Sequence, residues 1–174
     1  VVKVYSPSKK LEFEWHCSKE YVSSLALSRD GKQLFVAAIG VDNAEIYTRL
    51  LAFKTDKSEP KFDVKIKDTA MLKVLRQTGN KYVAVGNNKT VILTRSGKVK
   101  EEITYADDAL YTVENDRNNN ILLCYKEFGG SKIKMIKIPK SSSENKQAEI
   151  DYLPTSIDIK GNDIACALAD TVRV

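Results

Sequence analysis

Short strand-like runs follow one another along the whole sequence, and their spacing limits the fold more than any other feature. Val, Ile, Tyr and Thr gather in runs of about five to eight residues, and Gly, Asn, Asp and Pro separate the runs, which is the chemistry of strands and turns. Periodicity typical of a helix is almost absent. We therefore expect an all-β protein with strands at residues 1–5, 10–16, 21–28, 33–40, 46–54, 61–67, 70–77, 81–87, 90–95, 98–105, 108–115, 121–128, 131–138, 148–153, 155–160, 163–169 and 171–174.

These strands repeat as larger units. Residues 90–99 align with residues 1–11 as a strand, a tight turn and a strand, and residues 171–174 repeat the same opening. The turn and strand at residues 79–85 likewise match those at residues 161–167. The units come close to the period of about 40 to 50 residues that β-propeller blades show. Whole units are predicted at residues 21–67, 69–105 and 108–153, and partial units at residues 1–16 and 155–174.

The apolar pattern changes with the position of a strand in its unit. The second strand, for example residues 34–39, is apolar on both faces, as expected for a strand that lies between neighbouring blades. In the fourth strand Leu11, Phe13 and Trp15 alternate with polar or charged residues, which predicts an outer strand with these three side chains facing inward. The sequence therefore predicts a β-propeller of four-stranded antiparallel blades.

The number of units bears on whether the ring closes. About four periods fit between Val1 and Thr171, so that the chain begins and ends at the third strand of a blade. In a closed ring of four blades, residues 171–174 would duplicate residues 1–4 and have no strand to pair with. We expect part of a larger ring, whose open strand edges pair with another copy of the chain or fray.

Residues 21–32, followed by the apolar strand 34–38, resemble the WD40-like propeller repeat. The whole chain resembles an uncharacterised family of membrane-anchored propeller proteins from bacteria of the Firmicutes. The resemblance implies an apolar anchor outside this chain, a propeller on the extracytoplasmic face of the cell membrane, and no established activity. One departure is Lys9, which stands where the matching turn has Gly97. Because a left-handed backbone costs a lysine about 1 kcal/mol, we expect the turn at Lys9 to be of another type.

Composition and cysteine spacing exclude several classes of site. The chain is 43% hydrophobic and 29% charged, and none of its apolar runs approaches the roughly 18 to 20 residues of a membrane helix. Cys17, Cys124 and Cys166 are odd in number and far apart, which predicts neither a disulfide framework nor a zinc site. His16 and Cys17 are adjacent, and adjacent strand residues point to opposite faces, so they do not form a nucleophilic pair. We predict no catalytic residue and no cofactor.

Acidic residues recur where the chain enters the innermost strand of a unit. In a propeller such positions ring the mouth of the central channel, where carboxylates can converge on a cation such as Ca²⁺. The alternative is that these side chains stabilise turns, because Asp favours loops through hydrogen bonds to its own backbone. The candidate cation ligands are Glu20, Asp68, Asp107 and Asp108.

Charge is distributed unevenly over the expected turns. The net charge is +5, but 22 of the 28 basic residues are Lys and no basic cluster contains interleaved aromatics, so we do not expect nucleic acid as a partner. Turns at one end of the blades hold about seven more basic than acidic residues, and those at the other end about four more acidic ones. Chance, with screening by salt, is the alternative explanation. The candidates for binding an anionic surface are Arg76, Lys81, Arg95 and Lys98.

These observations favour a non-enzymatic binding or scaffold module. Its expected partner is a protein, a peptide or an anionic envelope polymer, and it meets the membrane only through the anchor. One alternative is a propeller-type enzyme, hydrolase or quinoprotein-like, with a cation at the channel mouth. Another is a structural or sensory ectodomain that transmits binding across a membrane anchor.

Overall fold

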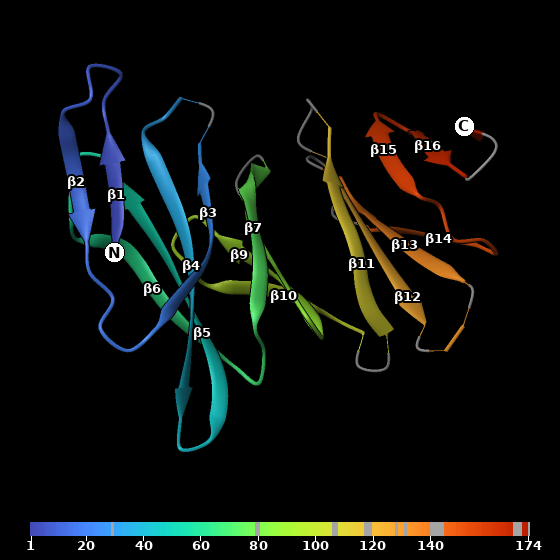
Figure 1. The fold of residues 1–174 in the computed structure, drawn as a ribbon, viewed down its shortest axis with the longest axis horizontal. Coiled ribbons are helices and arrows are strands. Elements are labelled where there is room, and N and C mark those ends of the chain that lie inside the picture. The colour runs from blue at the N-terminus through green and yellow to red at the C-terminus, as the bar shows by residue number, and fades with distance from the viewer. Residues whose placement is uncertain are drawn as a thin grey trace. The chain divides into compact units, whose positions relative to one another are not determined.

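The computed structural model describes residues 1–174 except residues 29, 79–80, 106–107, 117–119, 128, 131, 140–144, 169–171 and 174, and it describes only the backbone of residues 75–78, 108–109, 111, 127 and 172–173. Strands and turns make up the described chain, and the all-β prediction is confirmed (Figure 1). No helix in these residues is long and apolar enough to span a membrane.

Seventeen strands follow one another along the chain. They are β1 (Val2–Tyr5), β2 (Leu11–Trp15), β3 (Tyr21–Leu27), β4 (Gln33–Asp42), β5 (Glu45–Lys54), β6 (Pro60–Lys67), β7 (Met71–Thr78), β8 (Lys81–Gly86), β9 (Lys89–Thr94), β10 (Val99–Thr104), β11 (Asp108–Asn115), β12 (Ile121–Glu127), β13 (Ile133–Ile138), β14 (Lys146–Ile150), β15 (Ser156–Lys160), β16 (Asp163–Ala167) and β17 (Val172–Arg173).

The strands form antiparallel sheets in which each strand pairs with its neighbours in the sequence. Three sheets have four strands each, β3 to β6, β7 to β10 and β11 to β14, as predicted. The strands β1 and β2 form a two-stranded sheet, and β15 to β17 form a three-stranded sheet. Because the strands alternate in direction, the turn between the first and second strands of a sheet lies at the same end as the turn between its third and fourth strands.

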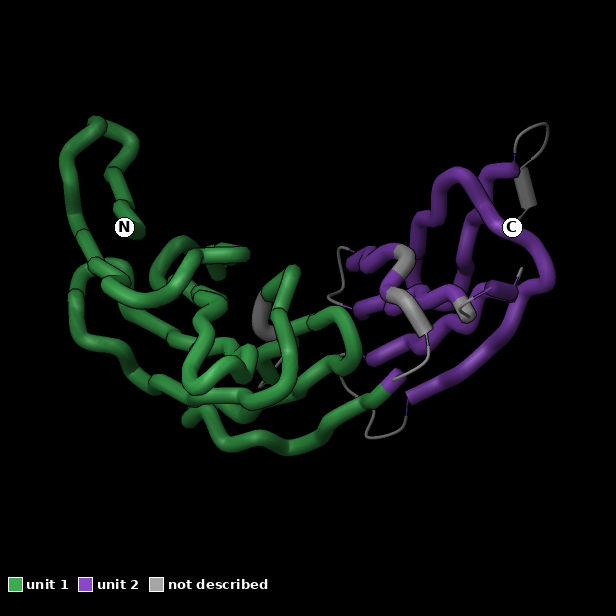
Figure 2. Tube along the Cα trace, turned by 60° about the horizontal axis from the view of Figure 1, so that its bottom comes forward, with its two compact units in different colours: residues 1–104 green, residues 105–174 purple. Residues whose placement is uncertain are grey.

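The chain divides into two compact units, residues 1–104 and residues 105–174 (Figure 2). In the first unit, one apolar cluster joins Val2 and Phe13 to Val36 and Phe53, between the sheet of β1 and β2 and the sheet of β3 to β6. A second cluster, which includes Phe35 and Tyr82, joins the sheet of β3 to β6 to the sheet of β7 to β10. The second unit has its own cluster around Leu122, Met135 and Ile159.

Burial follows the position of a strand within its sheet. All side chains from Leu34 to Ala38 in β4 are buried, as are those from Tyr82 to Val85 in β8, which agrees with the predicted second strands. In the outer strand β6 the buried side chains of Phe62 and Ile66 alternate with exposed ones. Burying apolar surface on both faces of the second strands stabilises the packing of each sheet against its neighbour.

The outer strand β2 differs in part from its prediction. Phe13 is 3% exposed and Trp15 is partly buried, but Leu11 is 43% exposed and does not face the core. The pairing of β1 with β2 shifts by one residue between Val4 and Tyr5, so that Leu11 lies opposite Tyr5. A one-residue shift moves a side chain to the other face of a strand, which explains why the alternation fails at Leu11.

The turn at Lys9 is also not of the expected type. The φ angle of Lys9 is 63° and that of Gly97 is 85°, so both residues take the left-handed conformation. Both turns have the same backbone hydrogen bonds: the Lys9 N–H donates to the Ser6 carbonyl at 2.9 Å and the Gly97 N–H to the Thr94 carbonyl at 3.0 Å. The expectation of a different turn is therefore wrong, and the turn geometry prevails over the conformational preference of Lys9.

The hairpin of β4 and β5 is longer than the corresponding hairpins. Each of its strands has ten residues, whereas β8 and β9 have six each. Its tip turns through Asn43 and Ala44, which have φ angles of 50° and 66°. Before the tip, Val41 and Ile46 lie opposite each other and are 66% and 46% exposed.

Candidate functional site

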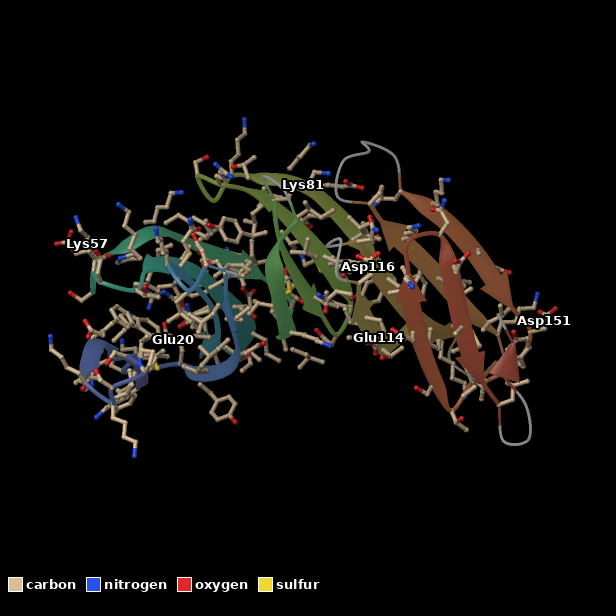
Figure 3. The ribbon with its side chains drawn as sticks, turned by 90° about the horizontal axis from the view of Figure 1, so that it is seen from above. Glu20, Lys57, Lys81, Glu114, Asp116 and Asp151 are labelled. Atoms are coloured by element: carbon tan, nitrogen blue, oxygen red, sulfur yellow. The ribbon has the colours of Figure 1, made fainter. Side chains whose placement is uncertain are left out.

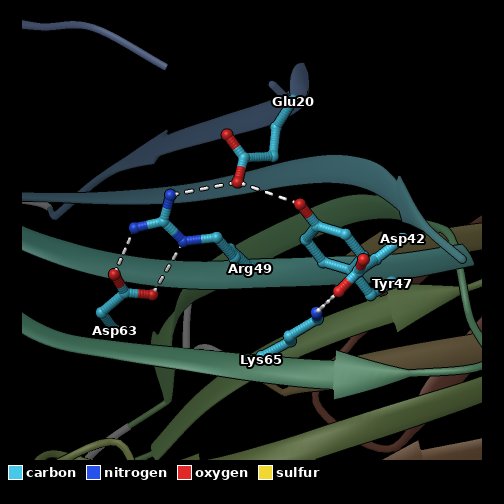
Figure 4. A network of polar contacts seen from close by, with 6 residues as sticks. All are labelled: Glu20, Asp42, Tyr47, Arg49, Asp63 and Lys65. Atoms are coloured by element: carbon cyan, nitrogen blue, oxygen red, sulfur yellow. Dashed lines mark hydrogen bonds and ion pairs between the residues drawn. The ribbon is translucent and has the colours of Figure 1, made fainter. Parts of the chain in front are cut away.

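Arg49 joins two carboxylates at the centre of a polar network (Figure 4). It extends from β5 toward Asp63 on β6 and toward Glu20, which directly precedes β3. Its Nε atom donates to Asp63 Oδ1 at 3.1 Å, its Nη2 atom to Asp63 Oδ2, and its Nη1 atom to Glu20 Oε1 at 3.1 Å. This two-bonded arrangement with Asp63 is the strong form of an arginine–carboxylate pair.

Tyr47 and Lys65 extend the network toward the tip of the β4–β5 hairpin. The Tyr47 hydroxyl donates to Glu20 Oε1 at 3.2 Å, and Lys65 Nζ lies 3.9 Å from the centre of the Tyr47 ring. Lys65 also donates to Asp42 Oδ2 at 3.0 Å. The ring can lie there because Gly40 has no side chain: a Cβ atom at Gly40 would come within 2.4 Å of Tyr47 Cζ.

In this network each carboxylate is paired with a cation, so that three carboxylates share two cations. Hydrogen bonding to Asp63, and then to Glu20, raises the pKa of Arg49 despite its partial burial. Hydrogen bonding to Lys65 lowers the pKa of Asp42, and burial followed by the charge of Glu20 raises the pKa of Tyr47. The groups are thus held in their ordinary charge states and paired, which favours a brace for the hairpin over an acid–base site. The sequence analysis missed this network, whose members come from separate strands.

The predicted cation ligands fall into different settings. Glu20 has a side chain that is 7% exposed and lies in the network of Arg49. Asp68 is exposed, has a φ angle of 56°, and its backbone N–H donates to the Ile46 carbonyl at 2.9 Å, which is turn chemistry. Asp107 and the side chain of Asp108 lie outside the described residues. Within the described part of the chain, no group of three or more His, Cys, Asp or Glu residues could hold a metal ion.

His16 contacts a carboxylate, and two of the three cysteines are buried. His16 Nε2 contacts Glu14 Oε1, and its side chain is 68% exposed. Burial raises the pKa of Cys124 to about 12 and also raises the pKa of Cys166, so both thiols stay protonated. A buried, protonated thiol is a poor nucleophile.

Basic side chains gather at one end of the sheets of the first unit. The β1–β2 turn and the C-terminal ends of β3 and β7 lie at the same end of these sheets (Figure 1). The β5–β6 turn joins them, because Thr55 donates from N to the Lys32 carbonyl at 3.1 Å and from Oγ1 to the Gly31 carbonyl at 3.0 Å. The Tyr82 hydroxyl, beside the β7–β8 turn, donates to Gln33 Oε1 at 2.6 Å.

We use the name basic rim for the basic residues at this end whose side chains the structure describes, including those of the β9–β10 turn. Lys57 and Lys81 are labelled in Figure 3, which views the sheets from above. Three carboxylates lie among the nine cations: Asp30, Asp56 and Glu59. Only Lys10 has a described carboxylate within 4.0 Å, namely that of Glu12. The basic rim consists of Lys9, Lys10, Lys32, Lys54, Lys57, Lys61, Lys81, Arg95 and Lys98.

The basic rim contains three of the four predicted anion-binding residues. Arg95 and Lys98 are exposed on the β9–β10 turn, and Lys81 is partly exposed at the start of β8. The backbone of Arg76 is in β7, and its side chain lies outside the described residues. At the opposite end of these sheets, Asp42 is paired with Lys65 and Glu20 with Arg49. The basic rim differs in that eight of its cations have no described carboxylate within 4.0 Å.

The second unit has a hollow of about 390 Å³ beside β13 and β14. Leu122, Met135 and Ile164 line it together with Lys137 and Asn162. The Lys137 ammonium group donates to the Gly161 carbonyl and to Asn162 Oδ1, the latter at 2.8 Å. Among the described residues that line it there is no carboxylate, histidine or cysteine.

Solved structures with a similar fold include a WD40 domain. The WD40 domain of Pan2 from Neurospora crassa has a TM-score of 0.56 and 13% sequence identity, with 84% of this chain and 43% of that chain covered. A protein of unknown function from Bacteroides caccae has a TM-score of 0.51 and 9% identity, with 84% and 53% covered. The chain thus spans about half the length of these structures or less. The fold is that of β-propeller blades, as predicted.

Comparison of sequences gives one further match. No curated protein matches the chain. The model of a single protein family, whose function is unknown, matches residues 1–174.

Proposed function

This chain belongs to the family of unknown function DUF5711, and we propose that it is a non-enzymatic binding module whose basic rim holds an anionic ligand. The observation that carries the proposal is the asymmetry of charge pairing in the first unit. Eight of the nine cations of the basic rim have no described carboxylate within 4.0 Å, whereas Glu20 and Asp42 at the other end are bound to Arg49 and Lys65. Exposed, unneutralised cations attract anionic partners over a Debye length of about 8 to 10 Å.

The scaffold supports this role because it holds the turns rigidly. The strands that follow the β3–β4 and β7–β8 turns, β4 and β8, are buried from Leu34 to Ala38 and from Tyr82 to Val85. Binding residues on loops fixed by a rigid scaffold lose little conformational entropy when a ligand binds.

We take the ligand to be an anionic polymer at the outer face of the cell membrane. This location rests on the resemblance to membrane-anchored propellers, and the cysteines are compatible with it. Cys124 and Cys166 are buried, so that their thiols are protected from an oxidising environment.

The direct test is a binding titration with two soluble polyanions, inorganic polyphosphate and poly-aspartate. Lys81, Arg95 and Lys98 are changed together with Arg76 to Gln. The matched control changes Lys19 and Lys126 to Gln, two lysines outside the basic rim. We expect the first variant to lose about tenfold or more in affinity and the control less than twofold, because each lost contact removes one released counterion. Affinity of the native chain should fall steeply with salt.

Two results contradict the proposal. One is an equal loss of binding free energy per removed charge in the two variants, which means that total charge and not the basic rim decides binding. The other is binding that does not depend on salt, since contacts between exposed charges are screened. Circular dichroism of both variants shows whether the sheets are intact.

A further inference from the structure

Three turns of the first unit share one geometry. In each, the fourth residue has a left-handed backbone and donates its N–H to the carbonyl of the first residue: Lys9 to Ser6, Gly31 to Ser28 and Gly97 to Thr94. In each, the hydroxyl oxygen of the first residue also accepts an N–H from beyond the turn, at 2.9 to 3.1 Å. The donors of these last bonds are Lys10, Gln33 and Lys98.

Two of the turns have a hydroxyl at the third position as well. Ser6 Oγ lies 2.8 Å from Ser8 Oγ, and Thr94 Oγ1 lies 3.0 Å from Ser96 Oγ. Each hydroxyl pair has two protons and uses one of them between its members. One hydroxyl proton in each turn therefore remains for an acceptor outside the pair.

The third turn already contains such an acceptor. Its third residue is Asp30, whose Oδ1 accepts the Ser28 hydroxyl at 2.6 Å and the Lys32 N–H at 3.1 Å. The hydrogen bond from Ser28, followed by that from Lys32, lowers the pKa of Asp30 and keeps the carboxylate charged. An anion of the protein itself thus occupies the place that is open in the two other turns.

Each open turn also contains two cations and no carboxylate of its own, and Lys10 Nζ lies 4.0 Å from Glu12 Oε1 on β2. Residues 6–10 include Lys9 and Lys10, and residues 94–98 include Arg95 and Lys98. At Gly97 no side chain is tolerated, because a Cβ atom there would come within 2.6 Å of the Phe62 ring. The cation of the β9–β10 turn is supplied by Arg95 instead, at the place of Pro7 in the β1–β2 turn.

We propose that the turns at residues 6–10 and 94–98 are two equivalent sites for a phosphate group, each combining a free hydroxyl proton with two cations. The inference deepens the proposed function, on which it rests for the anionic class of the ligand. Phosphate fits this arrangement better than carboxylate because it has more acceptor oxygens. A hydroxyl and two cations at different positions can each contact one of them. Arg95 adds a planar fork that suits phosphate oxygens. The source is either free phosphate or a phosphate polymer that reaches both turns.

The test follows backbone amide signals by nuclear magnetic resonance during titration with inorganic phosphate, and separately with acetate at equal ionic strength. We expect saturable shifts at Ser8 to Lys10 and at Ser96 to Lys98 with phosphate only. Asp30 to Lys32 should stay unchanged and serve as the internal control. Inorganic polyphosphate should bind more tightly than phosphate if one polymer occupies both turns, through its raised effective concentration. Equal affinity per phosphate group assigns free phosphate as the source.

Two variants make the test specific. Ser96→Asp gives this turn the anion that Asp30 provides in the third turn, so it should remove the response at residues 96–98 and leave the response at residues 8–10. Asp30→Ser removes the built-in anion and gives this turn a hydroxyl pair, so a new phosphate response should arise at residues 31–32. Arg95→Lys keeps the charge but loses the fork, and it should weaken binding at its own turn about threefold to tenfold.

The proposal is overturned if acetate produces the same shifts, if Ser96→Asp leaves the response of its turn intact, or if Asp30→Ser gains none. Its failure can be told from failure of the proposed function. Polyanion binding that depends on the basic rim without saturable phosphate shifts leaves the function standing and removes the two sites. Phosphate shifts at both turns without any polyanion binding leave the two phosphate sites standing and contradict the proposed function.

Discussion

Phe62 lies so close to Gly97 that a Cβ atom at this glycine would come within 2.6 Å of the aromatic ring. The left-handed φ angle of 85° would suit a glycine even without this contact. The left-handed backbone and the close contact with Phe62 both require a glycine at position 97. Lys9 occupies the same place in the β1–β2 turn, where there is room for a side chain.

The first prediction compares these two positions. Gly97→Ala should lower the free energy of unfolding by about 2 to 4 kcal/mol, because the left-handed backbone costs about 1 kcal/mol and overpacking against Phe62 costs about 1 to 3 kcal/mol. Lys9→Gly should raise it by about 1 kcal/mol. Urea unfolding of both variants measures the difference. A Gly97→Ala variant as stable as the native chain would show that Phe62 moves away without loss.

The second prediction concerns the two aromatic residues of β2. Phe13 is 3% exposed and its ring centre lies 5.1 Å from that of Phe53, so Phe13→Ala should cost about 3 to 5 kcal/mol. Trp15 is only partly buried between Phe53 and Arg49, at 5.6 Å and 5.9 Å, and Trp15→Ala should cost less, about 1 to 3 kcal/mol. Urea unfolding followed by circular dichroism compares the two. A larger cost for Trp15 would contradict this ranking.

The third prediction tests the brace around Arg49. Arg49→Ala leaves Glu20 buried without its cation, and we expect a loss of about 1 to 3 kcal/mol in the free energy of unfolding. Glu20→Gln keeps the shape and should cost less. In the double variant the two effects should not add, because Arg49 and Glu20 share one interaction. Strict additivity in this thermodynamic cycle would show that the two residues act independently.

The fourth prediction is a pH dependence that comes from Cys124. Burial raises its pKa from 9.0 to about 12, so the folded chain holds the thiol proton more tightly than the unfolded chain. This contribution to stability is complete below about pH 9 and is lost as the pH rises from 9 toward 12. Cys124→Ala should therefore lose less stability than the native chain over this range. Thermal melts at pH 8 and pH 10.5 provide the comparison, and identical slopes would contradict it.

Much of the fold can be predicted because strand, turn and burial patterns are local. The apolar runs at Leu34 to Ala38 and Tyr82 to Val85 indicate second strands before any contact is known. The side of β2 on which Leu11 lies could not be predicted, because it depends on a register shift against β1. The left-handed backbone of Lys9 could not be predicted either, because a conformational preference of about 1 kcal/mol is small beside the packing of two strands.

The sites are less accessible to prediction than the fold. Arg49 is 29 positions from Glu20 and 14 positions from Asp63, and the three residues meet only through sheet register. In the sequence, each of them resembles an ordinary surface charge. The acidic position before β3 was identified, but its arginine partner was not. The basic turns were predictable because turn charges can be sorted by strand order alone.

Every strand pairing described in the structure joins a strand to the next one in the sequence. Closing such a pair requires ordering only the few residues of the intervening turn, so the entropic barrier to each hairpin is small. Sheets of this kind have a low contact order for an all-β chain, which favours rapid folding of each hairpin before the sheets dock face to face. Folding of the chain is then limited by the meeting of preformed sheets and not by a search for distant strand partners.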